Sequence, residues 1–207
     1  MFTGIVQGKA QLIHLRQDQD LVRLAAEFPS GAIESVRQGA SVALDGVCLT
    51  VTGREGRTAF FDVMRTTLEI TTLGQRREGD WVNFERAMRA SDEVGGHLLS
   101  GHVAAVGVII SINELGHGRL INLQLPSALM PYVFAKGYIG VDGASLTIVE
   151  RLVDGFSVSL IPETLALTTL GEALVGTRVN IEIDSQTRAV VDTVERVLAE
   201  RAPSDER

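Results

Sequence analysis

Lysine and cysteine are both scarce in this chain of 207 residues. Lys9 and Lys136 are the only lysines, and 19 Lys+Arg against 26 Asp+Glu give a formal net charge of −7. Binding to nucleic-acid phosphates needs a basic face, so no nucleic-acid partner is expected. Cys48 is the single cysteine and cannot form an intramolecular disulfide.

Long hydrophobic runs and a leader sequence are also lacking. The most apolar run, VAAVGVIISI at 103–112, is far shorter than the roughly 20 residues of a membrane helix. Its β-branched residues favour a buried strand. The first residues, MFTGIVQGKA, lack the charged start and apolar core of a signal peptide. The sequence therefore predicts no membrane partner and a cytoplasmic location.

An internal repeat is what the chain does contain. DGVCLTV at 45–51 matches DGASLTI at 142–148, a shift of 97 residues. The same shift aligns FPS with LPS, TLEITTLG with TLALTTLG, and VNFE with VNIE. Such an ungapped repeat indicates duplication and two domains of one fold. We place the domains at 1–97 and 98–185, followed by a C-terminal helix and tail at 186–207.

Each repeat reads as a series of short strands. β-Branched or alternating segments are separated by Gly, Asp and Asn. In the first repeat these segments are IVQGKAQLI, LVRLAAEF, SVALDG, CLTVTG, TAFFDVM and WVNFE. Six short strands that close on themselves leave no sheet edge. The predicted fold class is all-β, with two tandem six-stranded antiparallel barrels.

The C-terminal segment has a different period. Between Gln186 and Arg201 apolar residues recur at helical spacing. They are Val190, Val191, Val194, Val197 and Leu198. A lone amphipathic helix must bury this stripe, so we expect it to pack on the barrels or to meet copies of itself in an oligomer. The last residues, 202–207, are expected to fray.

Duplicated domains offer two similar pockets for two similar ligands. A reaction between two identical molecules needs one donor and one acceptor, so positions where the repeats differ are informative. The sharpest difference is Cys48 against Ser145, each between an Asp-Gly turn and a Leu-Thr pair. Thr50 and Thr147 repeat beside them. Both side chains are nucleophiles or proton donors; the alternative is a small buried thiol and a turn hydroxyl.

Two histidines lie in the glycine-framed segment GGHLLSGH. His97 and His102 have no counterpart in the first repeat, so imidazole proton transfer would belong to the second. The alternative is a solvated linker histidine followed by one at a strand start. A metal site formed by both histidines and Cys48 has no standard ligand spacing in its favour.

Two further charged residues admit two interpretations each. Lys136 precedes GYIGVDG and is either a site residue or a solvated surface lysine. Asp184 is either a participant in the site or the cap of the helix that follows.

Six motifs in order resemble the riboflavin synthase family. They are MFTGIV, DGVCLTV, SDEVGGHLLSGHV, KGYIGVDGASLT, LIPETL and VNIEID, and the likeness runs from Met1 to the C-terminal helix. Val47 stands where some members carry a second cysteine. The resemblance implies Greek-key barrels in a homotrimer held partly by the C-terminal helices. Each active site would lie between the N-terminal barrel of one subunit and the C-terminal barrel of a neighbour.

The resemblance also implies a reaction. Two molecules of 6,7-dimethyl-8-ribityllumazine would give riboflavin and 5-amino-6-(D-ribitylamino)uracil by transfer of a four-carbon unit. No cofactor and no metal are implied, and association with a lumazine synthase is left open. Proximity would supply much of the rate, since both substrates are held as a fixed pair.

The family's site residues carry over by matching motif. The chemical participants implied are Phe2, which would cover the ring system, Cys48, His97, His102, Ser145, Thr147 and Asp184; which is base and which nucleophile stays open. The first pocket would be lined by Gly4, Ile5, Val6, Cys48, Leu49, Thr50, Asp62, Val63, Met64, Arg65, Thr66 and Thr67. The second would be lined by Gly101, His102, Val103, Lys136, Ser145, Leu146, Thr147, Ile161, Pro162, Glu163, Thr164, Leu165 and Ala166. Ser41 is a further expected substrate-binding residue.

Two other functions compete with this interpretation. A lumazine or flavin antenna protein would share the duplicated barrels and hold a chromophore without catalysis, but its second site should have decayed. Here both DGxxLT clusters are intact. A structural trimer with empty barrels would leave these paired polar clusters unexplained.

Overall fold

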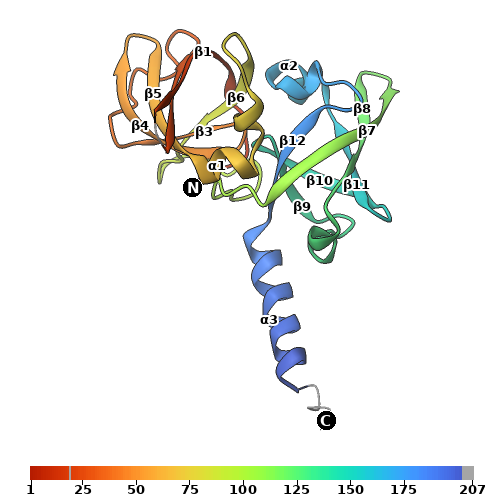
Figure 1. Ribbon diagram of the computed structural model, residues 1–207. Helices are drawn as coiled ribbons and strands as arrows, with labels where there is room; N and C mark the ends of the chain where they lie inside the picture. Colours follow the sequence, from red (N-terminus) through yellow and green to blue (C-terminus); the bar gives the residue numbers. More distant parts are fainter. Residues whose placement is uncertain (19, 202–207) are drawn as a thin grey trace.

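Two closed six-stranded antiparallel barrels and one long helix make up the computed structural model, which describes residues 1–18 and 20–201 (Figure 1). The predicted all-β fold of tandem barrels with a C-terminal helix is confirmed. The tail expected to fray, 202–207, lies outside the described residues. Within the described ranges, no helix is long and apolar enough to cross a membrane.

The first barrel is formed by the six segments expected from the sequence. Its strands are β1 (Gly8–Asp18), β2 (Leu21–Glu27), β3 (Ser41–Leu44), β4 (Val47–Glu55), β5 (Thr58–Met64) and β6 (Trp81–Arg86). Their order around the barrel is β1-β2-β5-β4-β3-β6, and β1 pairs with β6 to close it. Because β6 lies beside β3 and not beside β5, the connection is a Greek key.

The second barrel repeats this topology. Its strands are β7 (Ala105–Leu115), β8 (Gly118–Gln124), β9 (Tyr138–Val141), β10 (Ala144–Arg151), β11 (Gly155–Leu160) and β12 (Arg178–Ile183). Around the barrel β12 lies between β7 and β9, as β6 lies between β1 and β3. Equivalent strands therefore occupy equivalent places, as expected for a duplicated domain.

Short helices follow the fifth strand of each barrel. They are α1 (Arg65–Ile70) with the 3₁₀ turn η1 (Thr72–Gln75), and α2 (Pro162–Leu167) with η3 (Thr169–Gly171). A further 3₁₀ turn, η2 (Ser127–Tyr132), has no helical counterpart in the first barrel.

Strand β7 is less buried than the sequence suggested. Ile109 is 0% exposed, whereas its neighbour Ile110 is 42% exposed. One face of a barrel strand packs on the core and the other faces solvent, so the apolar run alternates in its environment. The prediction of a strand was correct, but full burial was wrong.

Helix α3 (Ser185–Arg201) stands away from both barrels (Figure 1). It has no buried residue, and Val190, Val194 and Leu198 are 64%, 51% and 65% exposed. Its link to the second barrel includes a hydrogen bond of 2.5 Å from the Tyr132 hydroxyl to Asp192. Most of the apolar stripe predicted from the sequence is thus exposed within one chain, with Val191 and Val197 partly covered.

Candidate active site at the junction of the barrels

The two Asp-Gly turns meet where the barrels touch. Both residues of each turn, Asp45-Gly46 and Asp142-Gly143, have positive φ, as a two-residue type I′ hairpin requires. A Cβ placed on Gly46 would lie 2.7 Å from the backbone nitrogen of Gly143. The turns can therefore pack back to back only because both carry glycine.

Reciprocal hydrogen bonds join the barrels around these turns. The Asn83 side chain donates to the carbonyl of Asp142 at 2.9 Å, and the Asn180 side chain donates to the carbonyl of Asp45 at 2.8 Å. Each aspartate carboxylate also accepts from the backbone N–H of the asparagine in its own barrel. Equivalent residues thus face one another across a pseudo-twofold axis.

Charge breaks the symmetry of this axis. Arg76 donates to the carboxylate of Asp45 at 2.6 Å, while the repeat places Ala173 at the position equivalent to Arg76. Burial raises the pKa of Asp45, and Arg76 partly offsets that rise. Burial and the neighbouring Asp45 raise the pKa of Asp142 well above its ordinary value. One cation therefore serves two buried carboxyl groups.

This arrangement makes stability depend on pH. Between its ordinary pKa and its raised pKa in the folded state, Asp142 keeps a proton that the unfolded chain has lost, so stability falls as the pH rises through that window. Asp142→Asn keeps an oxygen to accept from Asn180 but has no proton to lose. As the pH rises above the ordinary pKa of an aspartate, the melting temperature of this variant should fall less than that of the parent. If the melting temperatures of the parent and of Asp142→Asn changed equally with pH, the raised pKa of Asp142 would not be the cause of the pH dependence.

The segments that precede the barrels cross this junction. We call residues 2–6 and 99–103 the leading segments; they are equivalent in the repeat. Phe2 and Leu99 pair as an isolated antiparallel bridge, with N–H to carbonyl distances of 2.8 and 3.0 Å. Val6 then packs in the core of the second barrel, and Val103 in the core of the first. Each leading segment therefore completes the opposite barrel.

Because the leading segments cross the junction, each one lies beside the predicted site residues of the opposite barrel. The Ser145 N–H donates to the carbonyl of Gly4 at 2.8 Å, and the Cys48 N–H donates to the carbonyl of Gly101 at 2.9 Å. The resemblance grouped Gly4, Ile5 and Val6 with Cys48, and Gly101, His102 and Val103 with Ser145. That grouping was wrong, because the pairing of Phe2 with Leu99 directs each segment to the other barrel.

A cavity of about 170 Å³ lies beside Ser145. It brings together part of one leading segment, the start of β10 and helix α2. Its lining residues are Gly4, Ile5, Val6, Ala144, Ser145, Ile161, Glu163, Thr164, Leu167 and Thr168. Ala144, and Leu167 and Thr168 directly after the predicted segment, were missed by the sequence reasoning. The remaining residues of the predicted segment, Pro162, Leu165 and Ala166, lie on α2.

His97 is bound to Ser145 at the edge of this cavity. Its Nδ1 lies 2.6 Å from the Ser145 hydroxyl, and its ring stacks on Tyr138 with centroids 5.1 Å apart. His97 is only 6% exposed, so the solvated linker interpretation was wrong. Burial lowers the pKa of His97, against an opposing effect of Asp184. A neutral imidazole bonded to a hydroxyl can exchange a proton with it.

Asp184 caps helix α3. Its carboxylate accepts from the Thr187 N–H at 2.8 Å and from the Thr187 hydroxyl at 2.7 Å. Burial acts to raise the pKa of Asp184, but hydrogen bonds from Thr187 and Gln186 outweigh it, and nearby His97 adds to the lowering. The cap interpretation is therefore correct, and the same carboxylate also acts on His97.

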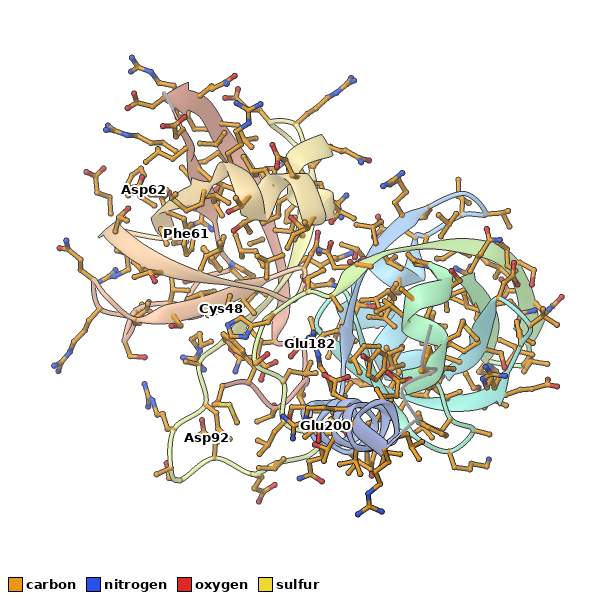
Figure 2. The ribbon with its side chains drawn as sticks, turned by 60° about the horizontal axis from the view of Figure 1, so that its bottom comes forward. Cys48, Phe61, Asp62, Asp92, Glu182 and Glu200 are labelled. Atoms are coloured by element: carbon orange, nitrogen blue, oxygen red, sulfur yellow. The ribbon has the colours of Figure 1, made fainter. Side chains whose placement is uncertain are left out.

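Cys48 occupies the equivalent place in the first barrel. It is partly exposed on β4, and Figure 2 shows it on the side of the first barrel that faces the second. Ser41 on β3 pairs with Thr50 on β4. Asp62 lies further out and lines a separate outer hollow with His14 and Arg23 (Figure 2). The other predicted residues of this barrel, Leu49, Val63, Met64, Arg65, Thr66 and Thr67, lie on β4, β5 and α1.

His102 follows the crossing to the Cys48 side. It is exposed, and its N–H donates to the Ser100 hydroxyl at 3.2 Å, next to Gly101. Among the described residues no group of three or more His, Cys, Asp or Glu side chains could hold a metal ion. His97, His102 and Cys48 therefore do not converge as a metal site would require.

Lys136 is exposed, as the surface interpretation expects, but its backbone is unusual. Its φ is +68°, and the equivalent residue in the first barrel is Gly39 at +85°. A side chain in this left-handed region costs of order 1 kcal/mol. Leu146 and Thr147 follow Ser145 along β10, the first buried and the second exposed.

Seven polar residues hold the junction together, and most of them were not singled out as site residues from the sequence. They are Asp45, Arg76, Asn83, Glu85, Asp142, Asn180 and Glu182, of which all but Arg76 are buried. The repeat of VNFE as VNIE contained the signal, because both copies place an asparagine and a glutamate two residues apart, on one face of a strand.

Comparison with known proteins gives the same two-part division. The lumazine binding domain family model matches residues 3–87 and 100–184. Riboflavin synthase of Escherichia coli is 50% identical over 202 residues, covering 97% of this chain and 95% of that protein. Riboflavin synthase of Chlamydia muridarum is 43% identical, covering 97% and 98%.

A solved structure is similar across both barrels. LumP complexed with riboflavin has a TM-score of 0.82 and 27% identity, covering 88% of this chain and 99% of LumP. The two barrels of one topology, the two matches to the family model and the similarity to the enzymes over nearly the whole chain agree. The chain belongs to the riboflavin synthase family and is built from two lumazine binding domains.

Proposed function

We propose that the chain is a riboflavin synthase that converts two molecules of 6,7-dimethyl-8-ribityllumazine into riboflavin and 5-amino-6-(D-ribitylamino)uracil. A four-carbon unit passes from one lumazine to the other. The two products contain all atoms of the two substrates, so the transfer needs no oxidant or other co-reactant. The domains 1–97 and 98–185 each provide a barrel with one substrate pocket, and the leading segment of the other domain completes that pocket.

Retention of both polar clusters is the observation that carries this proposal. Ser145 and His97 stand beside the Gly4 segment, and Cys48 stands beside the Gly101 segment. An antenna protein needs one chromophore pocket, so a second intact cluster favours the enzyme. Incubation with the lumazine tests the choice, because an antenna protein would bind it without consuming it.

The two clusters suit different tasks. The Ser145–His97 pair couples a hydroxyl to a neutral imidazole and can move a proton, as loss of a proton from the 7-methyl group of one lumazine requires. Cys48, without such a pair, is a nucleophile for activating the other lumazine. Holding the two substrates together supplies the rest of the rate.

Substitution in either cluster should slow turnover and leave the fold intact. Ser145→Ala removes the hydroxyl bound to His97, and Cys48→Ser weakens the nucleophile. Each should lower kcat about 100-fold, for Ser145→Ala because a positioned proton-transfer group is lost and for Cys48→Ser because a hydroxyl is a weaker nucleophile than a thiol. Steady-state rates measure the loss, and unchanged circular dichroism provides the control. Wild-type rates from both variants would remove these residues from the mechanism.

The same two variants test the assembly. We propose a homotrimer in which the apolar stripe of α3 meets its copies and each active site lies between neighbouring subunits. Mixed trimers of Cys48→Ser and Ser145→Ala chains would then contain some sites with neither substitution. After subunit exchange, activity should exceed that of either variant alone. Activity equal to the mean of the two would place the whole site within one chain.

A further inference from the structure

Each barrel ends in a buried glutamate that holds a leading segment. Glu85 on β6 accepts from the Thr3 N–H at 2.6 Å, the Thr3 hydroxyl at 2.8 Å and the Gly4 N–H at 3.0 Å. Glu182 on β12 accepts from the Ser100 N–H at 2.6 Å, its hydroxyl at 2.7 Å and the Gly101 N–H at 3.0 Å. Both glutamates are nearly buried, at 4% and 6% exposure.

The held segments lie directly on the nucleophiles of the opposite barrel. A Cβ on Gly4 would lie 2.5 Å from the Cβ of Ser145, and one on Gly101 would lie 2.4 Å from the Cβ of Cys48. Backbone hydrogen bonds hold both contacts in place: the Ser145 N–H donates to the Gly4 carbonyl at 2.8 Å, and the Cys48 N–H donates to the Gly101 carbonyl at 2.9 Å. A continuous series of close contacts therefore connects Glu85 to Ser145 through Gly4, and Glu182 to Cys48 through Gly101. Figure 2 shows Glu182 and Cys48 at the junction, on elements of different barrels.

We propose that Glu85 and Glu182 are crossed positioning residues: Glu182 of the second barrel places Gly101 on Cys48 of the first, and Glu85 of the first places Gly4 on Ser145 of the second. A carboxylate suits this task because its two oxygens accept all three bonds. Glutamine has one acceptor oxygen and would turn its NH₂ group toward an N–H donor. Glu→Gln keeps the shape but loosens the segment.

Cys48 reports on this arrangement without substrate, because it is the only cysteine in the chain. Because Gly101 packs against the Cβ of Cys48, the rate at which Cys48 reacts with 5,5′-dithiobis(2-nitrobenzoate) reports how firmly Gly101 is held there. Glu182→Gln should raise this rate about tenfold, the change expected when a hydrogen bond to a charged group is lost. Glu85→Gln is the matched control and should leave the rate within about twofold, although Glu85 belongs to the same barrel as Cys48.

A milder pair of variants keeps the test valid if the glutamine variant does not fold. Ser100→Ala removes one of the three bonds to Glu182 and should also accelerate labelling, while Thr3→Ala should not. Restoration of the slow rate in Glu182→Asp would show that the carboxylate matters. Equal acceleration by Glu85→Gln, or no acceleration by either Glu182→Gln or Ser100→Ala, would overturn the proposal.

Turnover supplies a second readout that rests on the proposed function. Both glutamine variants should lower kcat more than they change KM, since the segments position the reacting groups and make few contacts that bind substrate alone. The labelling rates require no riboflavin formation. Suppose that Glu182→Gln accelerates labelling of Cys48, that Glu85→Gln does not, and that the parent chain forms no riboflavin. This result would refute the synthase function but would still support the positioning roles of the two glutamates.

Discussion

Removing Met1 to Thr3 should lower the rate of riboflavin formation about 100-fold while both barrels remain folded. Phe2 is 1% exposed and forms the bridge to Leu99 that sends both leading segments across the junction. Without Phe2 and Thr3, Glu85 loses two of its three hydrogen bonds, and Gly4 keeps its contact with Ser145 without the support of the bridge to Leu99. The two substrates would then no longer be held in the arrangement that the reaction between them requires.

The full-length Phe2→Ala variant separates the side chain from the backbone. It keeps the Thr3 bonds to Glu85 but loses the buried ring, whose burial stabilises by about 1.5–3 kcal/mol. An intermediate loss of rate is expected. Circular dichroism and the melting temperature serve as controls for folding. Unchanged turnover in the truncated chain would remove the N-terminus from the active site.

Replacing Arg76 with Met should produce the largest loss of stability. The Asp45 side chain is 0% exposed and that of Arg76 is 24% exposed, with 2.6 Å between them. Breaking a buried pair by removing one partner leaves a carboxyl group unpaired and should cost about 3 kcal/mol. Urea unfolding measures the change, and the melting temperature should fall by roughly 2–4 °C for each kcal/mol lost.

Two further variants identify the cause. Adding Asp45→Asn to Arg76→Met removes the unpaired carboxyl group and should recover most of the loss, because an asparagine oxygen can still accept from Asn83. Arg77→Met is the control, since Arg77 is exposed beside Arg76. If the double variant is as unstable as the single one, the cost lies in lost packing of the Arg76 stem and not in charge.

The barrels were predictable because their signals are local. Asp-Gly turns, alternating strands and the shift of 97 residues each concern neighbours in the chain or a direct repeat. The same repeat identified Cys48 and Ser145 as equivalent, and the structure places each beside a leading segment at the junction.

The crossing of the leading segments could not be predicted in this way. TGIV at 3–6 and SGHV at 100–103 have the same pattern, and either barrel could accept either segment. The choice depends on the bridge between Phe2 and Leu99, a contact between residues far apart in sequence. The repeat also shows Arg76 opposite Ala173, but only the fold shows that Arg76 faces a buried carboxyl group.

Consumption of 6,7-dimethyl-8-ribityllumazine distinguishes a synthase from a protein that only binds this compound. The purified chain would be incubated with the lumazine and EDTA, without added cofactor, and substrate and both products would be quantified over time. We expect one riboflavin and one ribitylaminouracil for every two lumazines consumed, at a rate proportional to enzyme concentration. Binding of the lumazine with no consumption would contradict the synthase function and identify a chromophore-binding protein.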